Sequence, residues 1–380
     1  MHAMNASRIA PWHRLVCLLL FALGAAALGA AGVGAAAGAT ADPAAAAYVD
    51  GQGVAHLPAS SVPASRFLSP EARAKFIAQF AHHEPAPAAA PSVAQIRAHD
   101  EEKNAPFVAR DEILWPVDMQ PRVIGGVRTL VITPKAGIAL RNRARVLINL
   151  HGGGFVWGEG NGAKTESIPI AGVGRIKVIT VAYRLGPEFT FPAASEDVAA
   201  VYRALLKEYR ADNIGIYGCS AGGILAAEAV AWFHKVGLPR PGAIGTFCGS
   251  IAPLGGDSAR VGPLLVGERP PADADSDTLD NAYFRGASPA DPLVLPIKSP
   301  QLLALFPPTL LIAGSRDFTA SSLYAAQAAL TRAGVDAQLH VWDGMWHAFI
   351  MDPDLPESRE AFRVVVDFFD RHLGPRRRLQ

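Results

Sequence analysis

A serine flanked by small residues ends an apolar run in the stretch IYGCSAGG. A tight turn from a strand into a helix can expose a nucleophile only if the residues two before and two after it are small. Centred on Ser220, those residues are Gly218 and Gly222, but centred on Cys219 the first of them is Tyr217, which is too large. The pattern predicts Ser220 as a nucleophile and Cys219 as a small packing residue. A glycine-rich helix start without chemistry is the alternative for this motif taken by itself.

A second glycine-rich motif, HGGGF, follows the apolar run LINL at residues 151–155. Such glycines allow backbone N–H groups to point at one position, and a tetrahedral oxyanion requires donors of this kind. We expect the donors to be the N–H groups of Gly152, Gly153 and Ala221, the last directly after the predicted nucleophile. His151 is expected to support this loop as a hydrogen-bonded strut. A flexible glycine turn without a function is the alternative.

A serine becomes nucleophilic when a base takes its proton and an acid holds that base, in the chain order Ser, Asp or Glu, His. Four histidines follow the predicted nucleophile: His234, His340, His347 and His372. His347 lies in a predicted loop after a strand, where an imidazole can reach a serine, whereas the others fall in predicted helices or inside a strand. Asp317 ends the preceding strand and is the expected acid. Asp343, four residues before His347, is the rival.

The elements around these motifs predict an α/β fold with a mostly parallel central sheet. Apolar runs such as RVLINL, KVITVAY, NIGIYG and PTLLIAG alternate with helical patterns such as FPAASEDVAAVYRALLKEYR. Near-continuous apolar strands separated by helices are typical of a buried parallel sheet, which binds its ligands at the carboxyl ends of the strands. The motifs above fall at such strand ends.

The chain divides into segments of different texture. Residues 1–41 contain two arginines, an apolar core and small residues before Asp42, which predicts a cleaved signal peptide and a periplasmic or secreted protein. An uncleaved membrane anchor is the alternative. Residues 42–110 are rich in Ala and Pro, with one helix-like piece, and predict a cap or lid, or else a disordered tether. Residues 111–375 form the predicted catalytic domain, in which residues 253–300 are a candidate cap insertion.

Composition excludes several classes of partner. With 35 basic and 34 acidic residues the whole chain is nearly neutral, and cleavage after Ala41 would leave 33 basic residues. This balance argues against a nucleic-acid partner and, after cleavage, no stable membrane span is expected. Two cysteines would remain, too few for a disulfide scaffold. The segment DADSD resembles the start of a calcium loop but lacks the later glycine and glutamate, so neither a metal nor a cofactor is expected.

Four motifs in order, HGGGF, GCSAGG, GSRD and GMWHAF, resemble the bacterial hormone-sensitive lipase-like esterases of the α/β-hydrolase superfamily. The resemblance covers about residues 112–373 and implies a triad of Ser220, Asp317 and His347. The family usually has an acidic residue where this chain has Cys219. Many of its members also have Asp-Pro-Leu where this chain has Gly-Ser-Arg before Asp317. The resemblance further implies a cap built from the N-terminal segment.

The chemistry expected of such a site is hydrolysis of short to medium acyl esters through an acyl-enzyme. A deacetylase, lactonase or amidase would use the same triad, and a binding protein on a hydrolase fold is a more distant alternative. Three aromatic residues beside the motifs, Phe155, Trp157 and Trp346, are candidates for the wall of an apolar acyl pocket, with a plain core position as the alternative. The sequence does not decide between a monomer and a homodimer.

Overall fold

The computed structural model describes residues 47–81, 90–270 and 281–374. The predicted signal peptide, residues 1–41, lies outside these ranges. Within them, no helix combines the length and the apolar composition that crossing a bilayer would require.

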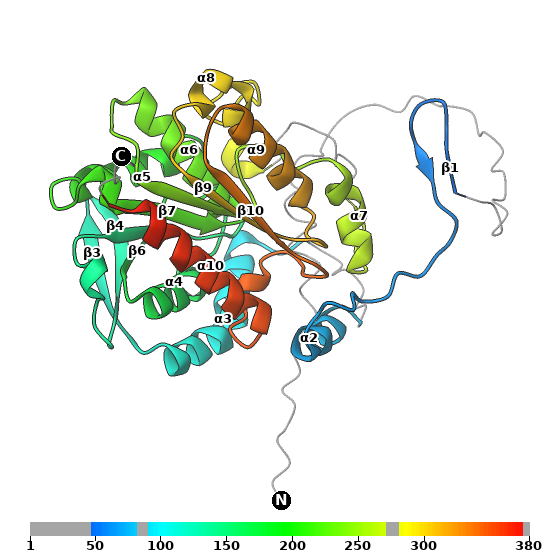
Figure 1. Cartoon of the computed structure of the whole chain (residues 1–380), viewed down its shortest axis with the longest axis horizontal. Coiled ribbons are helices and arrows are strands. Elements are labelled where there is room, and N and C mark those ends of the chain that lie inside the picture. Colours follow the sequence, from blue (N-terminus) through cyan, green and yellow to red (C-terminus); the bar gives the residue numbers. More distant parts are fainter. Residues whose placement is uncertain (1–46, 82–89, 271–280, 375–380) are drawn as a thin grey trace, which may run out of the picture.

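One sheet of eight strands forms the centre of the molecule, in the order β10-β9-β8-β7-β5-β6-β4-β3 (Figure 1). The pairs from β10 to β6 are parallel, while β4 runs antiparallel to both β6 and β3. This confirms the predicted fold class. The strands are β3 (Val117–Ile124), β4 (Val127–Pro134), β5 (Val146–Leu150), β6 (Lys177–Val181), β7 (Ile214–Cys219), β8 (Ala243–Phe247), β9 (Thr309–Gly314) and β10 (Ala337–Trp342).

Helices cover both faces of the sheet, which is why its inner strands can be apolar throughout. Every residue of β5, β7, β8 and β9 is buried. The helices α5 (Ala193–Leu205), α6 (Ala221–Lys235) and α9 (Ala320–Arg332) share one hydrophobic core on one face. On the other face, α4 (Asn161–Gly174) and α10 (Pro356–His372) build a second core (Figure 1). Both cores end at the strand termini that carry the predicted site.

The N-terminal segment contributes two helices, α2 (Pro70–Phe80) and α3 (Val93–Leu114). Ser69 caps α2 with its side chain, as its position before Pro70 suggests. A reciprocal capping box between Ser92 and Gln95 starts α3, which packs along α4. The predicted boundary after residue 110 is therefore displaced, because it falls inside α3 and residues 111–114 continue that helix.

The segment at 253–300 contains one longer helix, α7 (Asp257–Leu265), and the short α8 (Pro300–Leu303) begins at its end. A hairpin of β1 (Tyr48–Val49) and β2 (Ala55–His56) stands away from the body on the side of α7 (Figure 1). Short 3-10 turns complete the described chain: η1 (Leu140–Asn142), η2 (Ala211–Asn213), η3 (Ala282–Phe284), η4 (Pro296–Lys298) and η5 (Phe349–Met351).

Candidate active site

Ser220 lies in the turn between β7 and α6, with a left-handed φ of 56°. A side chain rarely adopts this conformation, and strained residues of this kind concentrate at functional sites. A Cβ atom at either Gly218 or Gly222 would overlap the carbonyl oxygen of Leu150 on the neighbouring strand. The steric argument made from the sequence therefore has a specific physical cause, which is the close approach of the turn to the end of β5.

The structure brings together the three residues of the predicted triad. Nε2 of His347 lies 3.0 Å from Oγ of Ser220, and Nδ1 of the same ring lies 2.8 Å from Oδ1 of Asp317. The Asp317 side chain is fully buried, whereas that of His347 is 24% exposed. The Phe318 ring packs on the imidazole at 4.6 Å between ring centroids. A base that contacts the nucleophile and is oriented from behind by a carboxylate is the arrangement that activates a serine.

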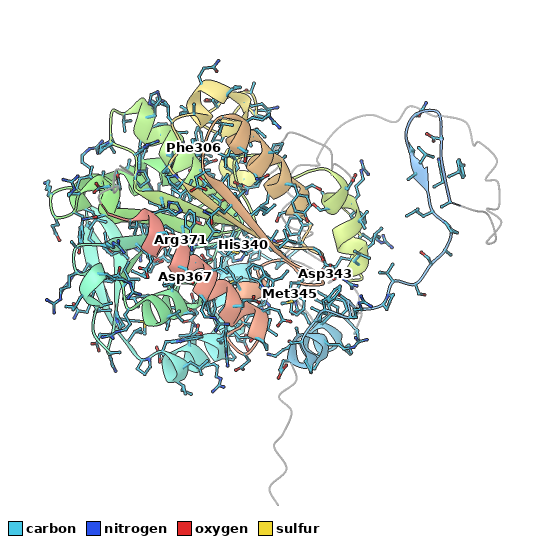
Figure 2. The ribbon with its side chains drawn as sticks, viewed as in Figure 1. Phe306, His340, Asp343, Met345, Asp367 and Arg371 are labelled. Carbon is cyan, nitrogen blue, oxygen red and sulfur yellow. The ribbon has the colours of Figure 1, made fainter. Side chains whose placement is uncertain are left out.

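The rival acid and the other histidines lie elsewhere. The Asp343 carboxylate accepts hydrogen bonds from Ser65 and, at 2.9 Å, from Ser315. The hydrogen bond from Ser65 is the main reason why the pKa of Asp343 falls below its ordinary value. Figure 2 shows Asp343 beyond the end of β10, on the side of the molecule where α2 and α7 lie, with His340 farther back along the strand.

One of the three predicted oxyanion donors is occupied. The N–H of Gly152 donates to Oε1 of Glu166 at 2.7 Å, so the prediction for this residue is wrong in this structure. The N–H groups of Gly153, Gly154 and Ala221 donate to no acceptor within the described residues. Gly153 and Gly154 have φ values of 105° and 57°, which aim this part of the loop differently from a regular strand. Gly154 thus replaces Gly152 as a candidate donor.

His151 supports the glycine loop as expected. Its ring is fully buried, lies 2.7 Å through Nδ1 from the Gly152 carbonyl oxygen, and stacks on Tyr183 at 4.3 Å between centroids. The Tyr183 hydroxyl in turn donates to the His151 carbonyl at 2.6 Å. Burial lowers the pKa of His151 to about 4, so the ring is neutral at neutral pH. A neutral and enclosed ring is suited to a structural task.

A cavity of about 170 Å³ opens beside the nucleophile, and Ser220 and His347 are in its wall. Trp157 and Trp346, two of the three aromatic candidates, also line it. Phe155 does not, because its ring is buried in a stack on Tyr283 with centroids 4.7 Å apart. The rest of the wall comes from α2, α3, the segment after α7 and the loop after β9, and includes Phe80, Asp100, Asn104, Val266, Arg316 and Phe318.

Helix α2 contacts this wall through aromatic side chains. Phe80 meets Trp346 edge to face at 5.7 Å, and Phe76 lies 6.0 Å from the same indole. The Arg316 guanidinium stands 5.0 Å from the centre of the Phe76 ring and donates to the carbonyl of Pro63. The N-terminal segment is therefore attached directly beside Asp317.

The two described cysteines are free, buried and close to the triad. A hydrogen bond with Cys248 is the first cause of the raised pKa of Cys219, and burial adds to it. Cys248, Asp317 and His347 also present possible ligand atoms within 4.8 Å of one another. The hydrogen bond between His347 and Asp317 accounts for most of that spacing, so we assign these two residues to the triad and propose no metal there.

The fold and the site agree with comparisons to known proteins. Residues 147–351 match the family described as the alpha/beta hydrolase fold. An acetyl-hydrolase of Streptomyces hygroscopicus is 30% identical over 237 residues, which are 62% of this chain and 78% of that protein. An ethyl acetate hydrolase of Pseudomonas putida is 30% identical over 240 residues, 60% of this chain and 73% of that protein.

Solved structures give the same result. A crystal structure of an esterase superposes with a TM-score of 0.71 at 28% identity, covering 84% of this chain and 99% of the other. An esterase of the bacterial hormone-sensitive lipase family superposes with a TM-score of 0.66 at 26% identity, covering 79% and 96%. The fold and the site define an α/β hydrolase. Within that class the chain belongs to the hormone-sensitive lipase-like esterases, and it is a carboxylic ester hydrolase.

Proposed function

We propose that the protein is a serine carboxylesterase in which Ser220, His347 and Asp317 are the catalytic residues. The single observation that carries this proposal is the unbroken contact from Ser220 Oγ through the imidazole to the buried carboxylate, at 3.0 and 2.8 Å. The elbow holds the hydroxyl in the wall of the cavity, where an ester carbonyl can approach it.

The reaction follows from this geometry. Nε2 of His347 takes the proton of the Ser220 hydroxyl as its oxygen attacks the ester carbon, and Asp317 stabilises the resulting imidazolium. Backbone N–H groups of Gly153, Gly154 and Ala221 are positioned to receive the negative charge that develops on the carbonyl oxygen. The imidazolium then gives its proton to the leaving alcohol, and water hydrolyses the acyl-enzyme by the same proton transfers in reverse.

The acyl group of the substrate is short in this proposal. Two similar proteins are named as an acetyl-hydrolase and an ethyl acetate hydrolase. The cavity of about 170 Å³ is also smaller than the roughly 300–1,000 Å³ of pockets for drug-sized ligands. A series of p-nitrophenyl esters from acetyl to palmitoyl would test it, with kcat/KM expected to be highest for acetyl to hexanoyl. A maximum at longer acyl chains would reject the short-acyl assignment while leaving the esterase intact.

The nucleophile can be tested directly. Ser220→Ala should lower kcat by roughly 10⁴-fold or more, since the attacking atom is lost. A fluorophosphonate probe should label the wild-type protein at Ser220 and leave the variant unlabelled. Unlabelled wild-type protein would instead favour a binding protein on a hydrolase fold. An anilide and a lactone in the same substrate series would separate an amidase or lactonase from an esterase.

We also propose that α2 and α3 are a lid over the cavity, as opposed to a tether. Phe80 from α2 and Asp100 and Asn104 from α3 form part of the cavity wall. Helix α3 is joined to the body by Arg97, which donates to Val156 O at 2.8 Å and pairs with Glu188 at 2.7 Å. A segment that encloses substrate in this way is suited to selecting among acyl groups.

Export to the periplasm or medium is a further part of the proposal and depends on the first 41 residues. A cell fractionation with N-terminal sequencing of the mature protein would test it. A start near Asp42 is the expected result, and an intact N-terminus in the cytoplasmic fraction would reject it.

A further inference from the structure

A buried carboxylate, that of Glu166 in α4, lies between the glycine loop and the strand that ends in the nucleophile. Only 6% of its surface is exposed. Its Oε1 accepts the Gly152 N–H at 2.7 Å. Its Oε2 accepts the Cys219 N–H at 3.2 Å and the Asn149 side-chain amide at 3.0 Å. One side chain therefore binds three separate places around the active site.

These three donors belong to the segments that carry the chemistry. Gly152 directly precedes Gly153 in the glycine loop, and Cys219 directly precedes Ser220. Asn149 ends β5, and its Oδ1 accepts the Thr180 hydroxyl at 2.8 Å, so its NH₂ group is the end that faces Glu166. The carboxylate thus sets the distance between the oxyanion donors and the nucleophile without contacting the reacting atoms.

The chemistry of the three donors requires an acceptor on both oxygens. An ionised carboxylate has acceptors only, whereas a glutamine would turn an NH₂ group toward one set of N–H donors. Such a donor facing a donor leaves buried polar groups unpaired, which costs about 1–3 kcal/mol for each. The requirement extends beyond volume and shape, since glutamine has nearly the same size as glutamate.

Burial opposes this ionised state and the hydrogen bonds favour it. Burial is the larger influence and raises the pKa of Glu166 to about 8, while the N–H donors at Gly152, Asn149 and Cys219 act in the other direction. The Asp100 carboxylate from α3 also disfavours the charge, and the Tyr217 hydroxyl donates to the backbone carbonyl of Glu166 at 3.0 Å.

We propose that Glu166 is a positioning residue that fixes the oxyanion loop relative to Ser220. The proposal rests on the proposed esterase function of the same site. Neither a loop held by its own glycines nor a packing role for Glu166 would make the N–H of Gly152 and the N–H of Cys219 share one acidic group.

The test is Glu166→Gln, with Thr165→Val as the matched control. Thr165 is the preceding residue of the same helix, is fully buried, and donates only to Gly162 O at 2.8 Å within α4. In p-nitrophenyl acetate hydrolysis, kcat of Glu166→Gln should fall by about 10²-fold, in the range seen when an oxyanion donor is lost. KM should change by less than about threefold, because the contacts with the ground-state ester are kept.

A second measurement separates positioning from folding. Binding of a phenylboronic acid, which forms a charged tetrahedral adduct on the serine, should weaken in Glu166→Gln in parallel with kcat and stay unchanged in Thr165→Val. If Glu166→Gln keeps kcat and boronate affinity within threefold of the wild type, while its Tm falls as in the control, the role is structural and the proposal fails.

A glutamine variant that does not fold is replaced by Glu166→Asp, which keeps the charge and shortens the reach by one methylene. Full activity in that variant would overturn the proposal, and a selective loss of kcat would support it. Failure of the esterase assignment itself has a different signature, namely a wild-type protein that fluorophosphonate does not label.

Discussion

Oδ1 of Asp317 lies 2.8 Å from Nδ1 of His347, and the same oxygen accepts the N–H and the hydroxyl of Thr319 at 2.9 and 2.8 Å. The carboxylate is therefore held from the protein side and presents a fixed acceptor to the imidazole. Asp343 is nearer in sequence to His347, but its oxygens bind the hydroxyls of Ser65 and Ser315.

Asp317→Asn should lower kcat by about 10⁴-fold, since an amide stabilises the wrong tautomer of the imidazole. Asp343→Asn is the control and should keep kcat within about threefold, because its hydrogen bonds are with serines outside the triad. Steady-state kinetics on p-nitrophenyl butyrate measure both. An active Asp317→Asn together with an inactive Asp343→Asn would transfer the acid to Asp343.

Cys219→Ser should remain active, since the thiol is a buried neighbour of the nucleophile and contacts Cys248. A hydroxyl placed in this apolar position should lower the free energy of unfolding by about 1–3 kcal/mol. Urea denaturation and ester hydrolysis measured side by side give both quantities. Loss of activity in a variant that is still folded would make the cysteine part of the chemistry.

Phe80→Ala should change the preference for acyl length, because this ring lines the cavity and packs on Trp346. We expect kcat/KM for p-nitrophenyl acetate to fall by about tenfold, with a smaller loss for octanoate, since the wall becomes wider and less apolar. Ile77→Ala on the same helix is the control, as Ile77 is 53% exposed. Equal profiles for the two variants would argue against a lid.

The truncation that the sequence suggests, beginning near residue 105, is a poor version of this experiment. It would cut α3 in its middle and expose the face of α4 that α3 covers. A loss of activity would then report damage to the fold as well as loss of the lid.

Asp111 in α3 makes stability depend on pH. The residue is fully buried, neither carboxylate oxygen has a hydrogen-bond partner in the described part of the chain, and burial raises its pKa to about 9. Because the pKa is higher in the folded protein, this group contributes stability below pH 4 that is lost as the pH rises toward 9. Asp111→Asn, which stays neutral, should therefore stabilise the protein at pH 8 by about 2 kcal/mol or more and have little effect at pH 4.

Thermal unfolding at both pH values measures this effect. Glu112→Gln, the exposed next residue of the same helix, is the control and should shift Tm only slightly at either pH. A Tm difference between Asp111→Asn and the wild type that does not depend on pH would show that Asp111 is ionised or protonated alike in the folded and unfolded states.

The sheet and the triad geometry were predictable because both rest on local rules. Apolar runs longer than a surface strand requires can only be buried in a parallel sheet, and a nucleophile elbow admits only glycine at Gly218 and Gly222. His347 could be selected because the other three histidines lie in predicted helices or inside a strand. These inferences depend on residues that are adjacent in sequence.

The features that the sequence did not predict depend on contacts between distant segments. Gly152 and Gly154 look alike in HGGGF, and only the carboxylate of Glu166 from α4 distinguishes them. The stack on Tyr283 that removes Phe155 from the cavity joins residues 128 positions apart. Helix α3 was masked by its charged and alanine-rich composition, although the capping box at Ser92 and Gln95 was a readable signal.

The contact of Gly218 and Gly222 with the Leu150 carbonyl has a consequence for engineering. The groups that break the ester bond are joined through main chain on adjacent strands, whereas part of the cavity wall comes from side chains on α2 and α3. Chemistry and selectivity are thus encoded by separate stretches of the gene. A combinatorial library restricted to the wall-facing codons of the two helices can be screened for new substrates with the bond-breaking apparatus left untouched.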